Sequence, residues 1–91
     1  TPGEQERKAI FRVHTKGKPI VKDVDLAELA KETEGMSGAD IELICREAAM
    51  QAVRERIEQD PKGKAPAQLL MTRRHFEQAL KAHRARRTSH G

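Results

Sequence analysis

The 91-residue sequence contains no tryptophan or tyrosine and only two phenylalanines. This composition is poor in the residues that favour β-strands and rich in helix formers. Its single cysteine excludes a disulfide within the chain and favours a reducing compartment. No apolar run approaches the roughly 20 residues that a membrane-spanning helix needs, and no signal-peptide pattern opens the sequence. We therefore expect a soluble, cytoplasmic protein with a helical fold.

Motifs for phosphate binding, metal binding and nucleophilic catalysis are also missing. Gly-Lys occurs at 17–18 and 63–64, without the upstream glycine and the following Ser or Thr of a phosphate-binding loop. The four histidines form no i, i+4 ligand pair, and one cysteine argues against a zinc site. Cys45 falls on the apolar side of a predicted helix, where a buried, inert thiol is the more common role. We expect no catalytic residue, no metal ligand and no enzymatic activity in this chain alone.

The formal net charge of +4 is unevenly distributed. Residues 73–91 hold six basic side chains and one acidic side chain, whereas residues 1–72 hold 12 basic and 13 acidic ones. A solvated, fraying end is one interpretation of this basic segment, and binding to nucleic acid or an acidic partner is the other. The one aromatic residue of this segment, Phe76, is expected on an apolar helix face, and none lies in the arginine cluster at 84–87 to stack on bases. Nucleic acid is therefore the weaker of these partners.

Apolar spacing and capping residues predict four helices, over residues 3–15, 25–34, 37–59 and from Thr72 onward. Capping-box pairs are expected at three helix starts, namely Thr1 with Glu4, Asp25 with Glu28, and Ser37 with Asp40. The expected apolar faces are Ile10, Val13 and His14 with Phe11 beside them; Leu26, Leu29 and Ala30; Ile41, Ile44, Cys45, Ala48, Ala52 and Ile57; and Phe76, Ala79, Leu80 and His83.

These elements predict an all-α fold, a small four-helix bundle. Residues 60–67 are punctuated by proline and glycine and are expected to form a loop. The apolar residues 69–71 that follow are expected to form a short extended segment before the last helix. We assign residues 1–87 to one helical domain and residues 88–91 to a disordered basic tail.

Several stretches in this order resemble the C-terminal helical lid of AAA ATPases, most closely the valosin-containing protein family and its archaeal VAT-type relatives. The matching elements are Arg7, Ile10 and His14, DVDL at 23–26, SGAD at 37–40 and CREA at 45–48. The resemblance extends over about residues 3–87. A lid of a proteasome-activating or membrane-protease AAA ATPase is the alternative within this class. An independent helical module that binds nucleic acid or an acidic partner through its basic end is the alternative outside it.

The resemblance implies the lid of a hexameric AAA ATPase that couples ATP hydrolysis to protein unfolding or extraction. In such proteins the lid closes over ATP, while a larger α/β subdomain carries the Walker motifs and binds magnesium. By match, Ile10 is expected to contact the adenine and His14 to lie by the ribose or base. Gly38 and Ala39 are expected to form the opposite wall, since small residues at a helix N-terminus let the backbone approach a ligand. The implied partners are the α/β subdomain, neighbouring subunits of a homo-hexamer and protein substrates, with no membrane.

Overall fold

The computed structural model describes residues 1–20, 23–63 and 70–89. Of residues 88 and 89 it describes the backbone only. Within these ranges the chain forms four helices, α1 (Glu4–Thr15), α2 (Leu26–Glu32), α3 (Gly38–Gln59) and α4 (Arg73–Ser89). The described residues include no β-strand, only an isolated parallel bridge between Ile20 and Met71. The predicted all-α fold with an extended segment before the last helix is therefore confirmed.

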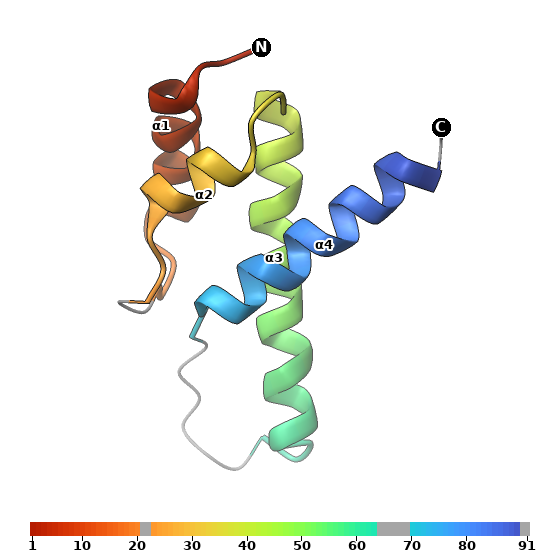
Figure 1. Cartoon of the computed structure of the whole chain (residues 1–91). Helices are drawn as coiled ribbons and strands as arrows, with labels where there is room; N and C mark the ends of the chain where they lie inside the picture. The colour runs from red at the N-terminus through yellow and green to blue at the C-terminus, as the bar shows by residue number, and fades with distance from the viewer. Residues whose placement is uncertain (21–22, 64–69, 90–91) are drawn as a thin grey trace.

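The long helix α3 runs through the centre of the molecule, and α1 and α4 lie against it (Figure 1). Helices α1 and α2 pack together, and α1 also packs on α3. Helix α4 crosses α3 obliquely and packs against it. The resulting body measures 44 × 29 × 18 Å. Among the described residues, no helix is both long and apolar enough to cross a lipid bilayer.

The starts of α2 and α3 are fixed by side-chain caps. Asp25 Oδ1 accepts hydrogen bonds from the amides of Ala27 and Glu28. At α3, Ser37 and Asp40 form the predicted capping box, in which each side chain bonds to the backbone amide of the other residue. These bonds satisfy amide groups that have no partner inside a helix.

The predicted cap of α1 is wrong. The helix begins two residues later than a Thr1 cap requires, with Gly3 in the capping position and no side-chain bond there. The reciprocal bond expected from Glu28 at α2 is also absent from the described contacts, because this carboxylate instead pairs with Arg73 of α4 at 2.7 Å. A long-range ion pair replaces the local bond that spacing predicted.

The core is formed by residues of all four helices, together with Met36 and Met71 from the connections between them. Its buried apolar residues are Phe11, Leu29, Met36, Ile41, Ile44, Cys45, Ala48, Ala52, Met71, Phe76, Ala79 and Leu80. All four residues predicted for the inner face of α4 are buried, including His83. Of the residues predicted on the other apolar faces, Val13 is 68% exposed and Ile57 is 58% exposed, and three are only half-buried, namely Ile10, His14 and Leu26. On α1 the inner positions belong instead to Arg7, Phe11 and Thr15.

Residues 19–20, which precede α2, lie beside Met71, which precedes α4. The amide of Met71 donates to the carbonyl of Pro19 at 2.9 Å, and Met71 is buried although Leu70 beside it is exposed. The predicted loop is described only over residues 60–63, and Leu69 lies outside the described residues. Helix α4 continues to Ser89, so helical backbone extends two residues into the stretch that we assigned to a tail.

Candidate functional site

The first turn of α3 lies against α1. A Cβ atom added to Gly38 would lie 3.6 Å from Ile10 Cδ1, an ordinary van der Waals distance. Ile10 is half-buried at the edge of the core. The structure thus brings together two of the four residues expected at a nucleotide, and Ile10 alone does not require glycine at position 38.

The same turn carries two available backbone donors. The amides of Asp40 and Ile41 bond to Ser37, through its hydroxyl and its carbonyl oxygen respectively. No hydrogen bond joins the amides of Gly38 and Ala39 to any residue in the described ranges. Because a helix N-terminus carries partial positive charge, these two amides can donate to a polar or anionic ligand atom. This turn thus combines small side chains with two backbone donors that no described residue uses.

The other two expected site residues lie on different helices, Ala39 in this turn and His14 on α1. Ala39 is exposed and lines an open hollow on α3 together with Glu42, Leu43 and Arg46. His14 lies one turn after Ile10 on α1 and is half-buried, and its imidazole makes no hydrogen bond to another described residue. Residues four apart share one side of a helix, so His14 extends the surface that Ile10 begins.

Asp40 connects this turn to α4. Its Oδ2 accepts hydrogen bonds from the amide and the hydroxyl of Ser37, both at 2.9 Å. Its Oδ1 lies 3.2 Å from Nε2 of the buried His83 on α4. The backbone bond from Ser37 is the main cause that holds the pKa of Asp40 below its ordinary value, with smaller contributions from the Ser37 hydroxyl, His83 and Arg87. This carboxylate therefore stays ionised at neutral pH.

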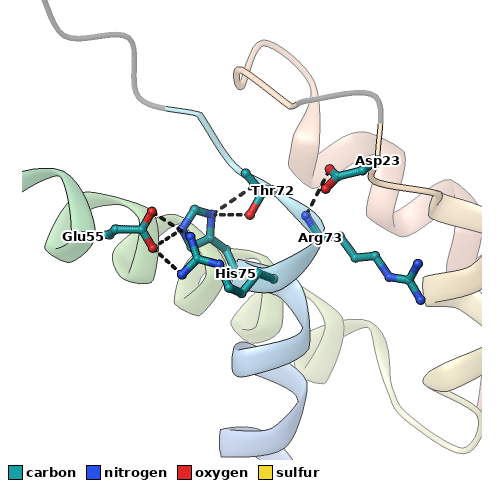
Figure 2. Close-up of polar contacts among 6 residues, drawn as sticks. Asp23, Glu55, Thr72, Arg73 and His75 are labelled. Carbon is teal, nitrogen blue, oxygen red and sulfur yellow. Dashed lines mark hydrogen bonds and ion pairs between the residues drawn. The ribbon is translucent and has the colours of Figure 1, made fainter.

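A second polar cluster joins the start of α4 to α3 (Figure 2). The amide of Thr72 donates to His75 Nδ1 at 2.9 Å, and His75 Nε2 lies 3.1 Å from Glu55 Oε2. Because Nδ1 accepts a hydrogen bond, a neutral His75 ring carries its proton on Nε2. This N–H donates a hydrogen bond to Glu55. Arg74 also contacts Glu55, at 2.6 Å. Hydrogen bonds from Arg74 and then His75 lower the pKa of Glu55 to about 2.

Thr72, His75 and Glu55 are placed in the order of a catalytic hydroxyl, imidazole and carboxylate. The hydroxyl oxygen lies 3.2 Å from Nδ1, and the three residues line one open hollow. A general base needs a free lone pair on the nitrogen that faces the hydroxyl. Here the Thr72 amide occupies that lone pair. The arrangement is therefore a helix cap and not a nucleophilic site.

Helix α4 is also held by residues near α2. Asp23 Oδ1 accepts a hydrogen bond from the amide of Arg73, the first residue of α4 (Figure 2). The Arg73 guanidinium bonds to Glu77 at 2.8 Å and to Glu28 of α2 at 2.7 Å. Arg84, three turns later, donates to the carbonyl of Glu32 at the end of α2. Arg73 and Arg84, on one side of α4, thus bind the first turn and the last residue of α2 respectively.

Sequence reasoning missed most of these polar links. Thr72 and His75 have the spacing of a capping box, with histidine where glutamate usually stands, and this signal was available. The partners Asp23, Glu28 and Glu55 come from other elements, and nothing in local spacing indicates them. Cys45 is placed as predicted: it is buried, and burial raises the pKa of its thiol to about 12.

Comparison with known proteins identifies the fold. Residues 23–63 match the family model of the AAA+ lid domain. The chain is 48% identical over 84 residues to the cell division cycle protein 48 homologue of Archaeoglobus fulgidus, a match that covers 88% of this chain and 12% of the relative. The chain belongs to the AAA+ lid family.

Two further matches show how widely this lid is shared. The proteasome-activating nucleotidase of Methanopyrus kandleri is 56% identical over 54 residues, which cover 59% of this lid and 12% of that protein. A solved structure from work on the structural basis for katanin self-assembly superposes with a TM-score of 0.77 and 30% identity, over 89% of this lid and 31% of that chain. The AAA+ lid is thus similar to those of several AAA ATPases, and it spans about one-eighth of the length of these curated relatives.

Proposed function

We propose that this lid belongs to a hexameric AAA ATPase, closes over ATP and transmits hydrolysis-driven motion for protein unfolding or extraction. The observation that supports the proposal is the junction of Ile10 with Gly38, at a helix turn where the amides of Gly38 and Ala39 bond to no described residue. Apolar surface, small side chains and helix N-terminal donors are the features that a base and its polar substituents need.

Each of the four residues has a physical role in this proposal. Ile10 supplies apolar contact for the adenine, and His14 extends that surface toward the ribose or base. Gly38 and Ala39 form the opposite wall and leave room for the ligand. Leucine at position 39 would fill this space, while the exposure of Ala39 means that the larger side chain disturbs no core contact. The lid itself provides no catalytic residue, so it is not an ATPase alone.

The remaining partners lie outside this chain. We propose that a large α/β subdomain of the same protein binds the ATP phosphates and magnesium, and that neighbouring subunits receive the motion of the lid. We also propose protein substrates and a cytoplasmic location, on the basis of the similarity to the cell division cycle protein 48 homologue. The match to the cell division cycle protein 48 homologue covers 88% of this chain, against 59% for the proteasome-activating nucleotidase, and this supports a valosin-type lid over a proteasome-activating or membrane-protease lid.

The alternative of an independent nucleic-acid-binding module has weak support. Among its basic residues, Arg73, Arg74 and Arg84 bond to Glu28, Glu55 and the Glu32 carbonyl respectively. Side chains held in this way are poorly placed to neutralise phosphates. A salt-sensitive DNA complex of this chain that is lost on removal of residues 84–91 would revive this alternative.

A chimaera tests the proposed function. This chain replaces the matching 84-residue segment of the Archaeoglobus relative, and ATP affinity and turnover are measured. We expect the chimaera to bind and hydrolyse ATP, and Ala39→Leu to weaken binding at least about tenfold through steric exclusion, a loss of about 1.4 kcal/mol. Ala85→Leu, the same change at an exposed position of α4, is the matched control and should leave affinity unchanged.

Two results would contradict the proposal. Unchanged ATP affinity in the Ala39→Leu chimaera would show that position 39 does not face the nucleotide. ATP turnover by the purified 91-residue chain would show that the chain is more than a lid.

A further inference from the structure

His83 is a buried histidine that the proposed nucleotide site does not use. Its side chain is 5% exposed and lies in the interface between α4 and α3. Neither ring nitrogen makes a hydrogen bond within the described residues. The Asp40 carboxylate, 3.2 Å from Nε2, is near enough for an ion pair but lies outside hydrogen-bond geometry. Buried polar groups without partners are rare, so this ring needs an explanation.

Asp40 is the residue through which the ring can act. One of its carboxylate oxygens closes the capping box with Ser37, and the other faces His83. The carboxylate is therefore held from two sides, by its own helix start and by a different helix. Gly38 and Ala39 lie between Ser37 and Asp40, so a displacement of this carboxylate displaces the turn that carries them.

We propose that His83 is a positioning residue for the first turn of α3, which it holds through Asp40 so that this turn moves together with α4. The function of the turn as a nucleotide wall rests on the proposed function, whereas the coupling of α4 to the turn does not. Through the contact of His83 with Asp40, a movement of α4 would also move Gly38 and Ala39, the residues proposed to face ATP.

The charges around the pair favour attraction. From α3 the ring faces Asp40, and from α4 the Arg87 guanidinium, one turn beyond His83, also acts on this carboxylate. Asp40 is ionised at neutral pH, so its carboxylate attracts an N–H of the ring at Nε2.

Amide hydrogen exchange in the 91-residue chain tests the coupling without any nucleotide. The reporter is the amide of Asp40, which donates to Ser37 Oγ in the capping box. We expect His83→Leu to accelerate its exchange about tenfold, as for the loss of a contact to a charged group. His83→Gln, which keeps a side-chain N–H donor, should restore most of the protection. Exchange at Ala52, three turns along α3, should change in neither variant.

A second arm separates positioning from general destabilisation. In an Asp40→Asn background the carboxylate is gone, so His83→Leu should add no further acceleration at residue 40. His14→Gln, at a histidine that does not contact Asp40, serves as the matched control. Equal exchange at Asp40 in the wild type and His83→Leu would overturn the proposal, as would equal effects of His83→Leu with and without Asp40. Either result leaves the nucleotide test at position 39 unaffected.

Discussion

The Nε atom of Arg7 in α1 donates a hydrogen bond of 2.8 Å to the carbonyl oxygen of Ala30 in α2. Arg7 is only 5% exposed, and its Nη1 donates to the carbonyl of Pro2, also at 2.8 Å. The last carbonyls of a helix have no partner within it. Arg7 from α1 and Arg84 from α4 therefore cap the end of a seven-residue helix that is too short to be stable alone.

Removal of the Arg7 bonds should destabilise the fold. We expect Arg7→Leu to lower the free energy of unfolding by about 1.5–3 kcal/mol, the usual range for hydrogen bonds to charged groups. Arg7→Lys keeps the charge but cannot reach both carbonyls, so its effect should be smaller. Urea unfolding followed by circular dichroism measures both. Arg12→Leu, at an exposed position on the same helix, should stay within about 0.5 kcal/mol of the wild type.

Local signals in the sequence predicted the helices well because α2 and α3 begin at capping residues and each helix carries apolar residues at helical spacing. Ser37 with Asp40, and Asp25 before α2, act in the structure as their spacing indicates. The prediction was wrong at Ile57, where the apolar face of the third helix was extended beyond its last buried residue, Ala52. Ile57 comes five residues after Ala52, which places it about 140° around the helix from that buried residue. Its exposure follows directly from this angle.

Alanine substitutions at two isoleucines of α3 should differ sharply. Ile44 is fully buried, so Ile44→Ala should cost about 2–5 kcal/mol through lost burial and a residual cavity. Ile57→Ala removes a side chain that is 58% exposed, and alanine is the better helix former, so stability should change by no more than about 0.5 kcal/mol. Chemical denaturation of the two variants checks this, and a cost above 2 kcal/mol at Ile57 would contradict the structure.

The candidate site was predictable only in part, because its two halves come from different elements. A capped helix start with Gly38 and Ala39 is visible in the sequence, and so is the face of α1 that carries Ile10 and His14. Their contact depends on how α1 packs on α3, for which single residues give no signal. The link from His83 to Asp40 spans 43 positions in the sequence for the same reason.

Cys45 should be unreactive until the chain unfolds. The thiolate is the reactive form of cysteine, and burial raises the pKa of this thiol to about 12, so almost none is present at pH 8. We expect alkylation by iodoacetamide to be negligible in the native protein and to rise with urea along the unfolding curve. In the Cys45→Ala, Ala85→Cys double variant, the thiol now at the exposed position 85 should react at once. Rapid native alkylation of Cys45 would show that α3 and α4 separate readily.

Glu55 should make the stability of the lid depend on pH in the acid range. Its pKa is lowered from an ordinary 4.5 to about 2, first by the hydrogen bond from Arg74 and then by that from His75. A lowered pKa in the folded state means that the ionised carboxylate stabilises the fold. This contribution is fully present above about pH 4.5 and disappears as the pH falls to about 2.

The contribution can be isolated by comparing melting temperatures of the wild type and Glu55→Gln across this range. At pH 6 the wild type should melt at the higher temperature, and the difference should shrink steadily as the pH falls from about 4.5 to about 2. Arg74→Gln should reduce the pH dependence, because it removes the first of the two bonds. Glu58→Gln, at an exposed position of the same helix, should lack this dependence. Because Glu55 is only partly buried, added salt should weaken the effect. A melting-temperature difference between the wild type and Glu55→Gln that is independent of both pH and salt would contradict this prediction. It would mean that packing, not charge, holds α4 to α3 at this point.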